Sequence, residues 1–134
     1  MAEAVQHARV GVLGSGAWGL ALARLFSNEG HDVTVWSESE QVVERLSATR
    51  TIPLPGDPDL PVEIALTTSV EEATAEKDVV VFVTSSRFVR SMAAAAAPHL
   101  RPGTVLVCAT KGLEEGTFDT MTEVIAGEVA RLRL

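Results

Sequence analysis

Short apolar runs alternate along the chain with longer stretches in which apolar residues return every three to four positions. The short runs, rich in β-branched residues, predict strands, and the longer stretches predict amphipathic helices. Strands are expected at Arg9–Leu13, Asp32–Trp36, Ile64–Thr67, Val79–Val83 and Thr104–Ala109. Val79–Val83 is apolar at every position, which is typical of a strand that helices cover on both faces of a parallel sheet.

Capping residues and helix breakers predict where the helices of the first half begin and end. A helix at Ala17–Asn28 is closed by Gly30, because glycine accepts a left-handed backbone at little cost. A serine followed three positions later by a glutamate, the capping-box pattern, predicts helices that begin at Ser37 and at Ser69. The first of these is expected to run to about Ala48.

Two more helices are expected in the second half. Ser85 or Ser86 is expected to cap a helix that continues through the alanine run, because alanine strongly favours helix, and Pro98 ends it. After Gly116, residues Phe118–Arg133 are expected to form the last helix.

Residues Thr49–Val62 contain four prolines and are expected to form an irregular loop, because proline interrupts both helices and strand ladders. Elsewhere strand and helix alternate with short links, which predicts an α/β, Rossmann-like, doubly wound and mostly parallel sheet. The 134 residues match the usual size of one domain, so residues 1–134 are interpreted as a single nucleotide-binding domain.

The first predicted strand leads directly into G-S-G-A-W-G at residues 14–19, a G-x-G-x-x-G pattern that opens the first helix. Gly14 is expected to make the tight turn, Gly16 to let a pyrophosphate approach the backbone, and Gly19 to allow close helix–strand packing. Free amides at the helix N-terminus then face the phosphates. The sequence therefore predicts a dinucleotide site.

Glu38 lies 19 residues after Gly19, at the end of the second strand, where such folds place the residue that binds the adenosine ribose. Its carboxylate can accept hydrogen bonds from the ribose hydroxyls and repel a 2′-phosphate, with Ser37 and Ser39 beside it as neutral donors. The alternative is a solvated acid in the first turn of a helix.

The formal charge of −7 disfavours nucleic acid and anionic membrane surfaces as partners, because both attract positive charge. Cys108, the single cysteine, is expected to be a small core residue. No run approaches the ~20 apolar residues of a membrane span, and a cytoplasmic location is expected. His7, His31 and His99 lack ligands at metal-site spacing, so no metal site is predicted.

The chain also carries V-T-V-W at 33–36, L-P-G at 54–56 and A-T-K-G-L-E at 109–114. In this order and spacing, these motifs and G-S-G-A-W-G resemble the N-terminal NAD(P)-binding domain of bacterial-type glycerol-3-phosphate dehydrogenase. The resemblance covers nearly the whole chain, and A-T-K-G-L-E is its most specific element. It implies NAD as cofactor, with NADP possible, and a small phosphorylated substrate for the intact protein.

The resemblance also implies roles for individual residues. Ala17 and Trp18 would flank the bound dinucleotide, Ser85 would lie near the nicotinamide, and Lys111 would reach toward cofactor and substrate. Glu38 stands where the family often has an arginine for the 2′-phosphate of NADP. Ala17 stands where the family usually has serine, and Thr84 where it has proline. Arg50 and Pro53 also depart from the family pattern, so the role of the loop that contains them is not carried over.

Lys111 follows the fifth predicted strand, at the carboxyl edge of a parallel sheet, where ligands of open α/β sheets bind. An ammonium there can neutralise a substrate phosphate or polarise a carbonyl as hydride arrives. Spacing alone would make Lys111 an ordinary surface lysine, and its place in T-K-G-L-E is what favours a functional role.

By resemblance, the general acid/base lysine lies in a second, helical domain outside these residues. The 134-residue chain is therefore expected to be the cofactor half of an oxidoreductase and to be inactive alone. Two alternatives stay open: a non-catalytic dinucleotide-binding or sensor module, and the Rossmann half of a ketopantoate- or hydroxyacid-type reductase. An open reading frame that continues beyond Leu134 for about 180–200 residues, the size of a further domain, would argue against the module.

Overall fold

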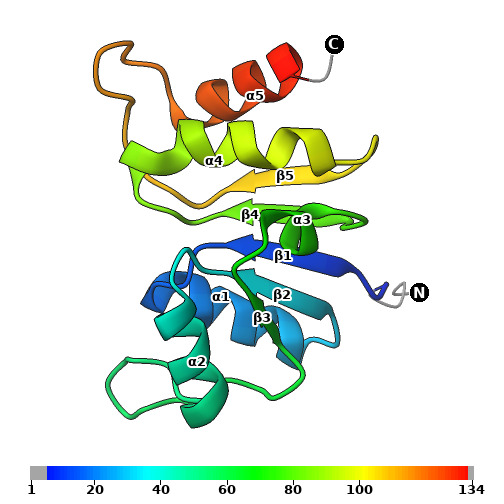
Figure 1. Ribbon diagram of the computed structural model, residues 1–134, viewed down its shortest axis with the longest axis vertical. Coiled ribbons are helices and arrows are strands. Elements are labelled where there is room, and N and C mark those ends of the chain that lie inside the picture. The colour runs from blue at the N-terminus through cyan, green and yellow to red at the C-terminus, as the bar shows by residue number, and fades with distance from the viewer. Residues whose placement is uncertain (1–5, 133–134) are drawn as a thin grey trace, which may run out of the picture.

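The predicted strands form one five-stranded sheet in the computed structural model, which describes residues 6–132 (Figure 1). All neighbouring strands are parallel, in the order β3-β2-β1-β4-β5. Their bounds are β1 Arg9–Leu13, β2 Asp32–Trp36, β3 Ala65–Thr67, β4 Val79–Phe82 and β5 Val105–Cys108. The last three are shorter than predicted by one or two residues, and the Rossmann-like fold is confirmed.

Two layers of helices cover the sheet, and the alternation of side chains along each strand divides the core between them. On β4, Val80 and Phe82 face one layer and Val81 the other. The helices are α1 Ala17–Asn28 and α2 Glu40–Thr49 on one face, and α3 Val70–Thr74, α4 Val89–Ala96 and α5 Met121–Leu132 on the other. Cys108 is half-buried and packs against the second layer.

The start predicted for α2 at Ser37 is wrong. The N–H of Ser37 still donates to the Thr67 carbonyl at the end of β3 (2.9 Å), so the chain turns two residues later. Ser39 is the N-cap, and its hydroxyl accepts from the N–H of Val42 (3.3 Å). The prediction at Ser69 is confirmed, since its hydroxyl accepts from the N–H of Glu72 (3.2 Å).

The starts predicted for the last two helices are also wrong. Ser85 makes no side-chain cap, and a 3-10 turn, η1 Ser86–Phe88, precedes α4 because the N–H of Phe88 bonds the Ser85 carbonyl (2.9 Å). Phe118 has φ 60°, which no helix tolerates, and Thr120 instead accepts from the N–H of Glu123 (3.2 Å). Arg133, the predicted last residue of α5, lies outside the described residues.

The proline-containing loop is irregular, as predicted, but it is well anchored. Its ends pair at Thr51 and Asp59, and Ile52 and Leu60 are buried in the core. The Arg50 guanidinium donates to the carbonyls of Pro61 (3.0 Å) and Ile64 (2.8 Å). These two hydrogen bonds join the start of the loop to its end.

The order of the strands locates the functional edge. The chain moves outward from β1 through β2 and β3, then returns to the other side of β1 as β4. At such a reversal the loops after β1 and β4 turn away in opposite directions and leave a crevice at the carboxyl ends of the strands. The glycine loop follows β1, and Ser85 lies just after β4, so both border this crevice.

Gly11, in the middle of β1, allows α3 to lie against the sheet. A Cβ on Gly11 would stand 1.8 Å from the backbone carbonyl oxygen of Ala73. Gly11→Ala is expected to reduce the free energy of unfolding by at least about 3 kcal/mol, because backbone must move to admit the methyl group. Urea unfolding of the parent and the variant measures the difference.

Gly127, in α5, is the matched control, because a Cβ there meets no atom within 4 Å. Gly127→Ala is expected to raise stability by about 0.5–1 kcal/mol through helix propensity. Equal unfolding midpoints for Gly11→Ala and the parent would contradict the close approach of α3 to β1.

Candidate functional site

The glycine loop brings β1, α1 and β4 into close backbone contact. Gly14 has φ 141°, and a Cβ on it would lie 2.8 Å from the carbonyl oxygen of Val83. A Cβ on Gly19 would lie 2.6 Å from the carbonyl oxygen of Gly14. Both positions therefore exclude any side chain, for the turn and the packing reasons that the sequence suggested.

Gly16 differs from its two neighbours in the motif, because a Cβ there would meet no protein atom within 4 Å. It is the N-cap of α1, and having no side chain it leaves the N–H groups of the first turn free. The positive end of a twelve-residue helix thus opens onto unobstructed space. This arrangement fits a phosphate group of a dinucleotide.

Ser37 and Glu38 lie beside the glycine loop but face different surroundings. Ser37 is buried, and its hydroxyl accepts from the Ser15 hydroxyl (2.9 Å) and from the N–H of Ser39 (3.3 Å). Ser37 therefore stabilises the glycine loop through Ser15. The sequence had suggested instead that Ser37 donates a hydrogen bond to the cofactor. Glu38 is exposed at the rim, in the position expected of a residue that binds a ribose.

Two adjoining clefts at the carboxyl edge of the sheet share Val83, Thr84 and Ser85, and together we call them the edge trough. The first, of about 340 Å³, is bordered by the glycine loop and Glu38. The second, of about 640 Å³, is bordered by Trp18 and Lys111. The trough therefore runs from the predicted ribose residue, past the phosphate position, to the predicted substrate lysine.

The structure brings most of the predicted site residues to this trough. Trp18 is 62% exposed and stands on the first turn of α1, directly after Ala17. Ser85 and Lys111 are exposed at the ends of β4 and β5. Three predicted residues do not line the trough: Ala17, Gly19 and Ser37.

The first cleft is also lined by residues for which the sequence predicts no role in binding: Ser15, Trp36, Val83, Thr84, Phe88, Ser91 and Met92. Phe88 and Met92 are one helical turn apart in the segment after Ser85. This spacing places both on one side of the helix, and it could have indicated that both face the cleft. Thr84 could be found only by its departure from the family pattern. Its hydroxyl oxygen is buried and has no hydrogen-bond partner within residues 6–132.

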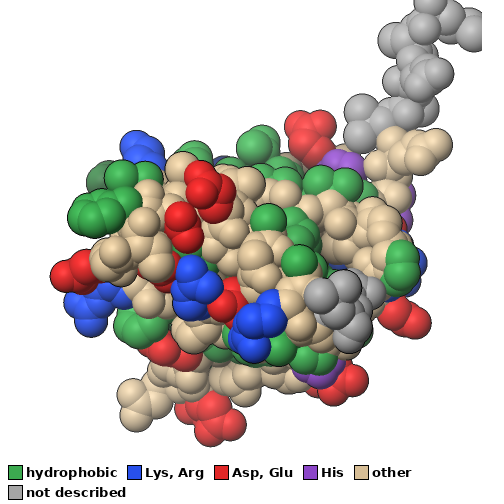
Figure 2. All heavy atoms as spheres, turned by 90° about the horizontal axis from the view of Figure 1, so that it is seen from above, with side chains coloured by type: hydrophobic (Ala, Val, Ile, Leu, Met, Phe, Trp, Pro, Cys, Tyr) green, Lys and Arg blue, Asp and Glu red, His purple; other side chains and the backbone are tan. Residues whose placement is uncertain are grey.

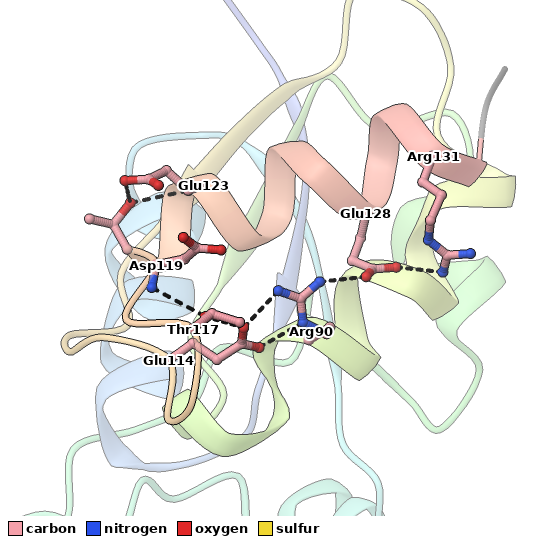
Figure 3. A network of polar contacts seen from close by, with 8 residues as sticks. Arg90, Glu114, Thr117, Asp119, Glu123, Glu128 and Arg131 are labelled. Carbon is pink, nitrogen blue, oxygen red and sulfur yellow. Dashed lines mark hydrogen bonds and ion pairs between the residues drawn. The ribbon is translucent and has the colours of Figure 1, made fainter.

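An ion-pair network holds the loop that follows Lys111 (Figure 3). Arg90 of α4 donates two hydrogen bonds to the Glu114 carboxylate (2.7 Å each) and one to Glu128 of α5 (2.6 Å). The Arg90 bonds, with that of Thr117, lower the pKa of Glu114 to about 2, and those of Arg131 and Arg90 lower the pKa of Glu128. Basic and acidic side chains lie next to one another on the face that carries α5 (Figure 2).

Within the described part of the chain, no group of three or more His, Cys, Asp or Glu side chains is arranged to hold a metal ion. None of the helices described is long and apolar enough to cross a bilayer.

The sequence model of the NAD-dependent glycerol-3-phosphate dehydrogenase N-terminus matches residues 9–133. Glycerol-3-phosphate dehydrogenase (NAD(P)+) 2 of Lactobacillus delbrueckii subsp. bulgaricus is 49% identical over 123 residues, which cover 91% of this chain and 36% of that protein. The corresponding enzyme of Geobacter sulfurreducens is 45% identical over 129 residues, covering 92% and 38%. The chain thus spans just over a third of the length of these relatives.

Among solved structures, glycerol-3-phosphate dehydrogenase from Coxiella burnetii superposes with a TM-score of 0.82 at 24% identity. The match covers 92% of this chain and 38% of that one, and it shows the shared fold. The family match extends over almost all of the residues that form the sheet, its helices and the edge trough. The resemblance inferred from the motifs is confirmed, and the chain belongs to the family of NAD-dependent glycerol-3-phosphate dehydrogenase N-terminal domains.

Proposed function

We propose that this chain binds NAD in the edge trough and forms the cofactor half of a dehydrogenase that interconverts sn-glycerol 3-phosphate and dihydroxyacetone phosphate. The observation that carries the proposal is the order of groups along the trough: Glu38, then the open helix end at Gly16, then Lys111. This order matches the ribose, the phosphates and the reactive end of a dinucleotide laid across the carboxyl edge of a parallel sheet.

Each part of the trough contributes a different interaction. The N–H groups after Gly16 would hold the pyrophosphate, and Glu38 would accept hydrogen bonds from the adenosine ribose. Trp18, Thr84 and Ser85 border the second cleft and would limit the access of water to it. Nicotinamide, when bound, supplies the hydride chemistry, so the protein contributes position and electrostatics.

Among residues 6–132, Lys111 is the one cationic side chain that lines the second cleft. Its ammonium would neutralise the substrate phosphate or stabilise the negative charge that develops on the carbonyl oxygen during hydride transfer. We propose that the general acid/base group comes from a second domain of the intact protein, in keeping with the family resemblance and with relatives of which this chain covers 36% and 38%.

The isolated 134-residue chain is expected to bind NAD but to show no steady turnover of sn-glycerol 3-phosphate or dihydroxyacetone phosphate. The cofactor trough is complete within the chain, whereas the acid/base group is expected elsewhere. Calorimetric titration with NAD and a spectrophotometric assay on the same sample test both halves of this expectation. Steady turnover by the purified chain would contradict the second half, and absence of NAD binding would contradict the proposed function.

Gly16→Val is expected to weaken NAD binding at least about 100-fold while the fold survives. A branched side chain would occupy the space beside the free N–H groups, and desolvated phosphate contacts are among the strongest in such sites. The backbone of Gly16 (φ −70°, ψ 173°) suits valine, and no protein atom obstructs it. Thermal unfolding provides the control for stability; undiminished NAD binding by a folded variant would place the phosphate site elsewhere.

The chain is expected to prefer NAD to NADP by about tenfold or more, because the Glu38 carboxylate repels a 2′-phosphate across a partly desolvated gap. Glu38→Arg is expected to improve NADP binding by a similar factor. Glu40→Arg makes the same charge change in the first turn of α2, outside the trough, and is expected to leave the NAD/NADP ratio unchanged. Calorimetric titration of NAD and NADP against the parent and both variants measures this ratio. Equal changes of the ratio in the two variants would show that net charge, and not the position of Glu38, sets the preference.

A further inference from the structure

Lys111 lies in a short segment between two fixed points. Upstream, the Thr110 hydroxyl donates to the carbonyls of Thr84 (2.7 Å) and Phe82 (3.3 Å), which ties the end of β5 to the end of β4. Downstream, the next strong anchor is Glu114. Gly112 lies between them with φ 113°, a conformation that favours glycine. Because glycine has no Cβ, the backbone has unusual freedom here unless its neighbours are held.

The downstream anchor belongs to a loop that is closed by its own hydrogen bonds. The N–H of Glu114 donates to the Asp119 carbonyl (2.8 Å), and the N–H of Phe118 donates to the Glu114 carbonyl (2.9 Å). The Thr117 hydroxyl adds a bond to the Glu114 carboxylate (2.7 Å). Residues 113–120 therefore form one hydrogen-bonded unit, and Leu113 and Thr120 pair at its base.

Arg90 fixes that unit to the rest of the domain. Two nitrogens of its guanidinium donate to the two oxygens of the Glu114 carboxylate. The Glu114 side chain is 18% exposed. A bidentate, partly desolvated pair of this kind is directional as well as strong. The third bond of Arg90 goes to Glu128, 7% exposed, so α4 and α5 are pinned to each other independently of the loop (Figure 3).

We propose that Arg90 and Glu114 are positioning residues for Lys111, and that their ion pair holds the ammonium of Lys111 over the second cleft of the edge trough. The ion pair acts on the loop three residues after Lys111, while Thr110 fixes the residue before it. Neither Arg90 nor Glu114 lines either cleft, so both act through the loop. The effect on cofactor affinity rests on the function proposed above.

The chain offers a direct probe, because Lys77 and Lys111 are its only lysines. Reductive methylation with ¹³C-formaldehyde keeps the positive charge and labels both side chains for NMR. Lys77 precedes β4, at the opposite edge of the sheet, and serves as the internal reference. Affinities for NAD and for ADP-ribose are measured separately by calorimetry on unmethylated protein.

Glu114→Gln and Glu128→Gln form a matched pair, because each removes one carboxylate from the same guanidinium. Glu114→Gln is expected to move the Lys111 signal toward that of a freely rotating lysine and to weaken NAD binding about fivefold or more. ADP-ribose affinity is expected to change less than about twofold, because its contacts lie at the glycine loop. Glu128→Gln is expected to leave the Lys111 signal and both affinities near the parent values.

Arg90→Lys keeps the charge but loses the two parallel hydrogen bonds to Glu114, so it is expected to weaken NAD binding to the same extent as Glu114→Gln; this variant is compared by calorimetry alone, because it adds a third lysine. Equal effects of the two glutamine variants, or an unchanged Lys111 signal in Glu114→Gln, would overturn the proposal. A moved signal with unchanged NAD affinity would overturn its link to the cofactor. Absence of NAD binding by the parent would count against the proposed function instead, and the Lys111 signal of the unliganded variants would still decide the positioning role.

Discussion

Close contact between backbone segments at the end of β1 is the constraint on which the rest of this structure depends. Gly14 stands against the carbonyl of Val83, and Gly19 against the carbonyl of Gly14, with no room for a Cβ at either. Gly11 provides the same clearance for α3 on the other face. At the glycine loop, β1, α1 and the end of β4 meet without side chains between them. This contact brings the N-terminus of α1 to the edge of the sheet, where it forms one wall of the trough.

The fold could be predicted from the sequence because its signals are redundant. Each predicted strand is a short run that contains β-branched residues, and the helices between the strands leave a parallel sheet as the simplest arrangement. The predictions for the helices are wrong at their starts, where a single hydrogen bond decides which residue is the cap. Ser37 has the residue type of a cap but is held in the sheet by Thr67, and Phe118 follows Gly116 in a loop with its own turn chemistry. Such choices depend on tertiary partners that no local pattern shows.

Part of the candidate site could likewise be predicted from the sequence, and part of it depends on tertiary contacts. The glycine loop and Lys111 occur in contiguous motifs, so sequence alone places them at one edge of the sheet. Ser37 was selected for its position, yet burial turns its hydroxyl toward Ser15. The role of Arg90 could not be predicted, because its partners are 24 and 38 residues away and only the packing of α4 beside α5 brings them together. Long-range ion pairs leave no local periodicity from which to infer them.

The strand order has a consequence for how the chain assembles. β1 comes before the other four strands of this sheet in the sequence, yet it lies in the middle of the sheet, and its pairing is complete only when β4 has joined it. The N–H of Arg9 bonds the carboxylate of Asp78, 69 residues later. Until that segment arrives, one edge of β1 has no partner and only β2 and β3 can join it. Of the four strand pairings, β1 with β4 joins the residues that lie farthest apart in the sequence, so it carries the largest entropic cost of loop closure in the sheet.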